Sequence, residues 1–306
     1  MSAVDLSVGL GPLALANPVL AASGCFGFGP EYARVVDASR LGAVVMKTLT
    51  VEPRAGNPPP RIAETVGGAL NAIGLENPGV AAFKSGMLEA IRDLGCPVIA
   101  SIAGKSEDEY AELARELDLD EIAAVEVNVS CPNVKEGGLA FGVSAEATGR
   151  VVAAVRKATG KPVLAKLSPN VTDIAEIARA AESSGADAVS LINTLLGLVV
   201  DWRRQKPFLG FGTGGLSGPC VKPVALRMVS EVARAVKVPV VGIGGIRTAD
   251  DAMEFLVAGA SAVQVGTANF ADPAAAFHVL DGLAERIELL GASSAREIVG
   301  TLKMKE

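Results

Sequence analysis

The sequence predicts an α/β fold built as one domain, a (β/α)8 TIM barrel that spans residues 1–306. Eight short runs rich in β-branched residues recur along the chain, and an amphipathic stretch follows each of them. The runs are almost continuously apolar, which is typical of a parallel sheet covered on both faces. A doubly wound open sheet is the alternative, because the order of the strands in a sheet cannot be read from a sequence.

The expected strands alternate with helical patterns along the whole chain. The helix signals are clearest at 106–117 and at 172–185, where Thr172 and Asp173 provide a start and Gly185 provides a stop. The expected strands cover residues 17–23, 42–48, 96–102, 122–128, 161–167, 187–193, 238–245 and 261–266.

Two connections, residues 49–78 and 194–221, are rich in proline and glycine and are too long to be simple barrel loops. Long loops in a compact domain are usually functional. Both connections follow the carboxyl ends of expected strands, where the active sites of barrel enzymes lie. We therefore expect long active-site loops at the carboxyl-terminal face of the strands.

Composition narrows the possible functions. Aromatic residues make up 4% of the chain and the formal net charge is −6, so nucleic acid is not an expected partner. No apolar segment reaches the roughly 18 to 20 residues that span a bilayer, and the first residues do not resemble a signal peptide. We expect a cytoplasmic protein without a membrane contact, in which the four cysteines are free thiols.

The inventory of metal ligands and bases is small. The cysteines lie far apart and form no C-x-x-C pair, so neither a metal site nor an iron–sulfur cluster is expected in this chain. His278 is the only histidine, and it lies in the helical stretch "PAAAFHVLDGLAERI". We expect His278 to be structural, which argues against a histidine-based catalytic triad.

Cys131 lies in a polar, glycine-flanked turn, "NVSCPNVKEGG", directly after an expected strand. Most cysteines are small buried hydrophobic residues, and that is the alternative here. The polar turn at a strand end favours a functional thiol. Because His278 is the only histidine, Cys131 is more plausible as a proton acceptor than as a nucleophile for acyl transfer.

Lys47 and Lys166 each end an apolar strand, and a buried lysine requires an anionic partner. A flavin ring fits, because a cation near N1–C2=O stabilises the reduced, anionic flavin. Asn71, Asn128 and Asn193 offer paired donors and acceptors that suit a planar heterocycle with imide and carboxylate edges. The alternative for each asparagine is a cap in a loop.

Glycines follow the seventh and eighth expected strands, in "GIGGI" and "VGTANF". The backbone N–H groups of Gly244, Gly245, Gly266 and Thr267 could surround a phosphate there, at the usual phosphate site of this fold. The alternative is a pair of tight turns that bind no ligand.

These motifs together resemble dihydroorotate dehydrogenase, the flavin enzyme of pyrimidine biosynthesis, over nearly the whole chain. The motifs are "NPVLAASG", "MKTLT", "GNPPPR", "NAIGLENPG", "NVSCPN", "KLSPN", "INTLLG", "GIGGI" and "VGTANFADP". Taken together they are highly specific, although any one of them alone would not be.

The resemblance implies that dihydroorotate lies on FMN and that Cys131 is the catalytic base. The residues it places at the substrate are Lys47, Asn71, Ile73, Gly74, Leu75, Asn128, Asn193 and Thr194. The residues it places at FMN are Ser23, Gly24, Lys47, Thr48, Asn128, Lys166, Ile192, Gly218, Gly244, Gly245, Gly266 and Thr267.

Within the family, "ETVGGALNAIGLENPGV" and "NTLLG" followed by "TGGLSGP" resemble the NAD-linked type, class 1B. That resemblance implies a catalytic subunit that pairs with a second subunit carrying FAD and a [2Fe–2S] cluster, as a homodimer core within a heterotetramer. The chain departs from the family pattern at Cys25, at Cys220 and in "DWRRQKPFLGF" (201–211). These departures leave open the effect of a thiol near the flavin and the way that loop closes.

Four alternatives remain at this point. One is the fumarate-linked class 1A enzyme, which also has a cysteine base. Another is a flavin-free phosphate-binding barrel, such as an isomerase or a lyase, although it would not explain Cys131 and the two lysines. The others are a non-catalytic flavin-binding subunit and a flavin reductase that acts on uracil-type bases.

Overall fold

Eight parallel strands close into a barrel in the computed structural model, which describes residues 4–130 and 141–304. Each strand pairs with the next one along the chain, and the last pairs with the first, as Val263 opposite Val19 shows. The barrel strands are β3 (Val19–Ala21), β4 (Ala43–Val45), β7 (Val98–Ile102), β8 (Ala124–Asn128), β9 (Val163–Lys166), β10 (Ala188–Leu191), β15 (Val240–Ile243) and β16 (Ala262–Val265). The predicted barrel is confirmed, and the open sheet is excluded.

The strands are apolar because both of their faces are covered. Every residue of the eight barrel strands is buried, so no strand shows the alternation of a half-exposed sheet. Each predicted run contains one barrel strand, although the hydrogen-bonded part is shorter than the run. The flanking residues of each run lead into the loops that carry the site.

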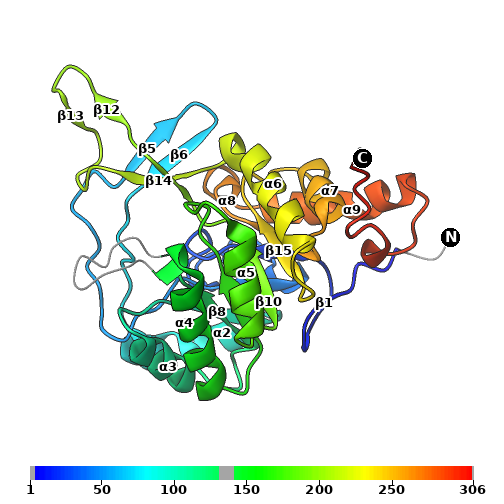
Figure 1. Cartoon of the computed structure of the whole chain (residues 1–306), viewed down its shortest axis with the longest axis horizontal. Coiled ribbons are helices and arrows are strands. Elements are labelled where there is room, and N and C mark those ends of the chain that lie inside the picture. The colour runs from blue at the N-terminus through cyan, green and yellow to red at the C-terminus, as the bar shows by residue number, and fades with distance from the viewer. Residues whose placement is uncertain (1–3, 131–140, 305–306) are drawn as a thin grey trace.

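Helices surround the barrel, as Figure 1 shows. Ser106 caps α3 by accepting a hydrogen bond from the Glu109 amide at 3.2 Å, and Asp173 caps α5 by accepting from the Ala175 amide at 2.9 Å. Both predicted helices are therefore confirmed. The helices are α1 (Val80–Gly86), α2 (Leu88–Arg92), α3 (Glu107–Glu116), α4 (Ala145–Ala158), α5 (Ile174–Ser183), α6 (Lys222–Ala233), α7 (Ala249–Ala258), α8 (Ala268–Ala271) and α9 (Ala275–Leu289).

A small hairpin that is not predicted from the sequence, β1 (Val8–Leu10) with β2 (Leu13–Leu15), closes the amino-terminal end of the barrel. Its turn lies against Asp187, directly before β10, and a Cβ added to Gly11 would be 2.9 Å from the Asp187 Cβ. The described residues also contain four single turns of 3-10 helix: η1 (Ala38–Arg40), η2 (Phe141–Val143), η3 (Pro219–Val221) and η4 (Ala295–Glu297).

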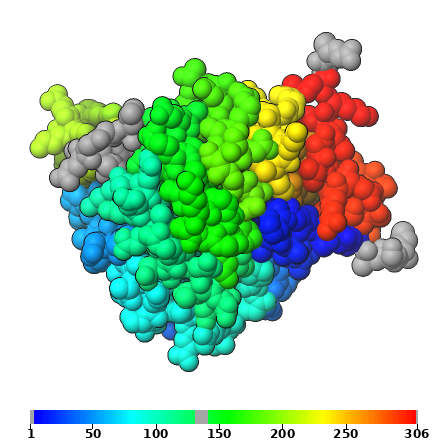
Figure 2. Space-filling view, turned by 60° about the horizontal axis from the view of Figure 1, so that its bottom comes forward, coloured from blue at the N-terminus to red at the C-terminus, as the bar shows by residue number. Residues whose placement is uncertain are grey.

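The two ends of the chain lie on the same side of the molecule. The Asp5 amide donates to the Ser293 carbonyl at 3.0 Å, and Nε of Arg296 donates to the Ser7 carbonyl at 3.0 Å. Figure 2 shows this contact between the N-terminal segment in blue and the C-terminal segment in red. No helix in residues 4–130 and 141–304 is long and apolar enough to cross a membrane.

The two long connections contain strands that pair with each other. β5 (Ile62–Thr65) and β6 (Gly68–Asn71) come from the first connection, and β11 (Leu195–Gly197) and β14 (Gly214–Ser217) come from the second. They form one antiparallel sheet in the order β11-β14-β6-β5, called the loop sheet below. The sequence predicts loops in both connections, because pairing between residues as far apart as Asn71 and Gly215, 144 positions, leaves no local signal.

A second hairpin, β12 (Val200–Asp201) with β13 (Lys206–Pro207), projects from the loop sheet beyond the body of the barrel (Figure 1). Trp202 at its tip is 70% exposed, and Val200 is 53% exposed. Exposed apolar side chains on a projecting element are typical of a protein contact. Except for Val200, this hairpin lies within the 201–211 segment that departs from the family pattern.

Candidate active site

Polar side chains from neighbouring strand ends meet at the carboxyl-terminal face of the barrel. Ser23 follows β3, and its Oγ donates to the Met46 carbonyl at 2.7 Å and lies 3.2 Å from Oγ1 of Thr48, which follows β4. Lys47 lies beside them, because a Cβ added to Gly24 would be 3.9 Å from the Lys47 Nζ. Ser23, Gly24, Lys47 and Thr48 therefore form one group.

A second group comes from β8, β9 and β10. Nδ2 of Asn193 donates to Oδ1 of Asn128 at 3.2 Å, and Asn128 stands opposite Lys166 in the β8–β9 register. Tyr110 of α3 donates from its hydroxyl to the Asn128 carbonyl at 2.8 Å and fixes that end of β8. Nδ2 of Asn170 donates to the Thr194 carbonyl at 3.0 Å, which holds Thr194 beside this group.

The two groups share one electrostatic environment. Burial lowers the pKa of the Lys47 ammonium, and the positive charge of Lys166 lowers it further, while Cys25 and Glu76 oppose the shift. Burial also raises the pKa of the Cys25 thiol to about 11, against the effect of both lysines. The half-buried Lys47 and the buried Lys166 both lower the pKa of the Cys25 thiol, so both positive charges lie near it. Two such cations make the carboxyl-terminal face of the barrel suited to an anion.

Glu126 is buried in the site region and is not among the residues predicted from the sequence. Its Oε2 accepts from Oγ of Ser190 at 2.9 Å and from Nε2 of Gln264 at 2.8 Å, and its Oε1 lies 3.8 Å from Nζ of Lys166. The signal was present, because a glutamate interrupts the otherwise apolar run at 122–128. A charged residue at the centre of a fully buried strand requires a partner inside the barrel.

The glycines after β15 and β16 form a crowded backbone cradle. Gly244 has φ +131° and Gly245 has φ +78°. A Cβ on Gly245 would lie 2.9 Å from the Gly218 carbonyl oxygen, and one on Gly244 would lie 3.4 Å from Cγ1 of Ile192. Thr267 joins the same place by donating from Oγ1 to Oγ of Ser217 at 2.9 Å.

This cradle fits a phosphate group. Gly244, Gly245, Gly266 and Thr267 lie outside the strands, and in the described part of the chain their N–H groups donate to no backbone carbonyl. Backbone N–H groups without an acceptor are a common means of binding an anion. At Gly244 and Gly245 an added Cβ would also lie 2.8 Å from a neighbouring side chain, so these two positions favour glycine.

The loop sheet brings the remaining predicted residues to the same face. Nδ2 of Asn71 on β6 donates to the Gly215 carbonyl on β14 at 3.2 Å. A Cβ on Gly215 would lie only 2.0 Å from Oγ1 of Thr194, so the sheet is in contact with the end of β10. Register and close packing therefore connect Asn71 with the group around Asn193.

The segment after Asn71 is held by the "GNPPPR" stretch. The Asn57 amide donates to the Ile73 carbonyl at 3.0 Å, and Arg61 forms an ion pair with Glu76. Gly74 has φ +78°, and Leu75 has φ +56°, a conformation that is uncommon for a residue with a side chain. Ile73, Gly74 and Leu75 thus form a constrained turn, and Glu76 beside them acts on Lys47.

Cys131 lies outside the described residues, so its predicted role stays a prediction. Ser130, directly before it in the sequence, is held at the end of β8, because its N–H donates to Oδ1 of Asn128 at 3.2 Å and its Oγ donates to the Lys166 carbonyl at 3.2 Å. His278 lies on α9, is 65% exposed and has its Nδ1 3.1 Å from Oδ2 of Asp272. The outer helix layer therefore holds the only histidine.

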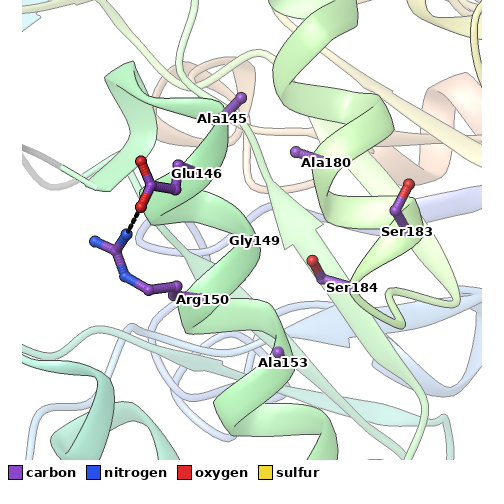
Figure 3. A pocket seen from close by; sticks show the side chains of 8 residues that line it. All are labelled: Ala145, Glu146, Gly149, Arg150, Ala153, Ala180, Ser183 and Ser184. Atoms are coloured by element: carbon purple, nitrogen blue, oxygen red, sulfur yellow. Dashed lines mark hydrogen bonds and ion pairs between the residues drawn. The ribbon is translucent and has the colours of Figure 1, made fainter.

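A shallow hollow lies away from the strand ends, between α4 and α5 (Figure 3). It is lined by small side chains, including Ala153 and Ala180, and by the ion pair of Arg150 with Glu146, whose atoms are 2.6 Å apart. Its position between two outer helices makes it a packing groove. In the described residues, no group of three or more His, Cys, Asp or Glu side chains could hold a metal ion.

The fold is that of an α/β-barrel enzyme, and lysines, amides and glycines gather at the carboxyl ends of its strands, where the active sites of such enzymes lie. The dihydroorotate dehydrogenase family model matches residues 5–287. The chain therefore belongs to the dihydroorotate dehydrogenase family.

Curated relatives match over nearly their whole length and share one name, dihydroorotate dehydrogenase B (NAD(+)), catalytic subunit. The protein from Geotalea uraniireducens is 53% identical over 303 residues, 99% of each chain. The protein from Bacteroides fragilis is 52% identical over 301 residues, 98% of this chain and 99% of that one. A solved DHODH from Eimeria tenella has a TM-score of 0.81 over 97% of this chain and 88% of its own, and at 23% identity it shows the shared fold.

Proposed function

We propose that the chain is the catalytic subunit of an NAD-linked dihydroorotate dehydrogenase and oxidises (S)-dihydroorotate to orotate in pyrimidine biosynthesis. The observation that carries this proposal is full-length identity of about half with relatives of that name. The site supports it, because Lys47, Asn71, Asn128 and Asn193 converge on one face of the barrel and suit a small planar anion.

FMN fits the remaining features of the site. Its phosphate would be held by the N–H groups of Gly244, Gly245, Gly266 and Thr267, with Gly218 and Ile192 beside them. Ser23, Gly24, Lys47, Thr48, Asn128 and Lys166 would hold the ring. FMN, when bound, supplies the acceptor for the hydride that leaves C6 of dihydroorotate. A flavin-free isomerase or lyase would account for the cradle but not for Lys47, which forms no ion pair in the described residues.

The chain's own residues would bind the substrate and move one proton. Lys47 would neutralise the carboxylate of dihydroorotate, and Asn71, Asn128 and Asn193 would bind the edges of its ring. Thr194 and the turn of Ile73, Gly74 and Leu75 would complete the pocket. Cys131 would take the proton from C5, so that the C5–C6 bond becomes the double bond of orotate.

We further propose a partner subunit that carries FAD and a [2Fe–2S] cluster and delivers the electrons to NAD⁺. The printed name of the relatives, catalytic subunit, supports a partner of some kind. Around this chain we propose a homodimer core within a heterotetramer. The exposed apolar side chains of the β12–β13 hairpin, among them Trp202 and Val200, support a protein contact.

Acceptor assays with the purified chain test this proposal. The chain alone, given dihydroorotate, should reduce artificial dyes but not NAD⁺, and addition of an iron–sulfur flavoprotein subunit should bring NAD⁺ reduction. Efficient fumarate reduction by the chain alone would identify the class 1A type instead. NAD⁺ reduction by the chain alone would remove the need for a partner.

A further inference from the structure

Glu126 and Lys166 form an ion pair inside the barrel that substrate binding does not require. Glu126 on β8 is completely buried, and Lys166 on β9 is 7% exposed. Their atoms Oε1 and Nζ are 3.8 Å apart. Within the described chain, Lys166 is the one cation that forms an ion pair with Glu126.

The two oxygens of Glu126 have different surroundings. Oε2 accepts two hydrogen bonds, from Ser190 on β10 and from Gln264 on β16. Oε1 has no hydrogen-bond partner in the described residues, and neither has Oε1 of Gln264. The carboxylate is thus fixed by one oxygen, and its other oxygen faces the ammonium of Lys166.

The hydrogen bonds alone do not explain a carboxylate at this position. A glutamine at residue 126 could accept the same bonds from Ser190 and Gln264 with its carbonyl oxygen. Its NH₂ group would take the place of Oε1, which lies 3.8 Å from Nζ of Lys166 and accepts no hydrogen bond in the described residues. Burial of a charge is costly unless it is used. The feature that a glutamine could not reproduce is the negative charge beside Lys166.

We propose that Glu126 is a positioning residue that fixes Lys166 and offsets part of its positive charge, thereby holding the midpoint potential of the bound flavin low. This inference rests on the proposed function, in which Lys166 contacts the flavin ring. A cation beside the ring favours the reduced, anionic flavin and raises its potential. A carboxylate 3.8 Å from that cation opposes the effect. A low potential suits an enzyme whose electrons must reach a nicotinamide.

The test is an equilibrium redox titration of the bound flavin at neutral pH, against a reference dye. Glu126→Gln should shift the midpoint potential to a more positive value. Glu126→Asp retains the charge but withdraws it from Lys166, and it should shift the potential in the same direction by less. Ser190→Ala is the matched control, because it removes a bond to the same carboxylate without changing a charge, and its potential should equal that of the wild type.

A double-mutant cycle shows whether Glu126 acts through Lys166. Glu126→Gln should shift the potential less in a Lys166→Met background than in the wild type. An equal shift in both backgrounds would overturn the proposal, and so would an unchanged or more negative potential in Glu126→Gln or in Glu126→Asp. Failure of the proposed function is a separate result, because then the wild-type chain would not bind FMN or would not be reduced by dihydroorotate.

Discussion

Asn193 and Asn128 are joined across the mouth of the barrel, where Nδ2 of Asn193 donates to Oδ1 of Asn128 at 3.2 Å. Oδ1 of Asn128 also accepts from the Ser130 amide, and Oδ1 of Asn193 accepts from the Thr194 amide at 2.8 Å. The acceptor ends of both side chains are therefore occupied by the protein. Nδ2 of Asn128 has no acceptor in the described part of the chain, so the pair presents donors to a ligand.

Loss of one of these donors should weaken the binding of orotate. Asn193→Ala should raise the dissociation constant of orotate by about tenfold or more, because a hydrogen bond to a charged or carbonyl ligand contributes about 1–3 kcal/mol. Isothermal titration of the FMN-loaded chain measures this change. Ser183→Ala, on the outer face of α5, is the control and should bind orotate as the wild type does. Equal affinities in the two variants would remove Asn193 from the substrate site.

Lys47 should make the binding of orotate depend on pH. Burial holds the pKa of its ammonium below the ordinary value of 10.5. As the pH rises toward that lowered pKa, Lys47 loses its proton, and the affinity for the anionic ligand should fall at a lower pH than for an exposed lysine. Orotate titrations between pH 7 and pH 10 measure the effect.

Two variants isolate the contribution of Lys47. Lys47→Met should bind orotate weakly at every pH and should lose most of the alkaline decrease. Lys84→Met, which removes a surface ion pair with Glu116, should keep the wild-type profile. A flat wild-type profile, or an unchanged profile in Lys47→Met, would contradict a carboxylate contact at Lys47.

Crowding at the glycine cradle should control the retention of FMN. A Cβ on Gly245 would lie 2.8 Å from the Cβ of Lys222 and 2.9 Å from the Gly218 carbonyl oxygen, so Gly245→Ala requires the cradle to open. We expect Gly245→Ala to weaken FMN binding by about tenfold or more, or about 1.4 kcal/mol. Flavin fluorescence during dilution measures the release.

Gly291→Ala is the matched control for this substitution. Gly291 has nearly the same backbone angle, φ +74° against +78° for Gly245, but no atom lies within 4 Å of an added Cβ. Both substitutions therefore place a side chain on a backbone with a positive φ, which favours glycine. Only in Gly245→Ala does the added Cβ also come too close to neighbouring atoms. If both variants retain FMN equally well, the phosphate does not lie in this cradle.

The barrel could be predicted because its strands carry a local signal. Runs such as 42–48 and 238–245 are apolar throughout, and a strand buried on both faces requires that composition. The loop sheet carries no such signal. Asn71 and Gly215 are paired across 144 residues, and the short strands around them are half-buried and contain glycine.

The site was predictable where a residue type is unusual for its position. Lys47 and Lys166 are conspicuous in apolar strands, and the structure places both at the carboxyl-terminal face of the barrel, Lys47 after β4 and Lys166 at the end of β9. Glu126 is equally conspicuous in the sequence, but its role depends on Ser190 and Gln264 from distant strands. Only the closure of the barrel brings those three side chains together.

The central claim is that this chain oxidises dihydroorotate, and anaerobic mixing of the FMN-loaded chain with dihydroorotate tests it most directly. The yellow flavin absorbance should disappear as one orotate forms per flavin. In Cys131→Ala, which should still bind FMN and orotate, the reaction should be slower by about a hundredfold to ten-thousandfold, as expected for loss of a general base. A wild-type flavin that stays oxidised would contradict the claim, and bleaching of Cys131→Ala at the wild-type rate would show that the thiol is not the base.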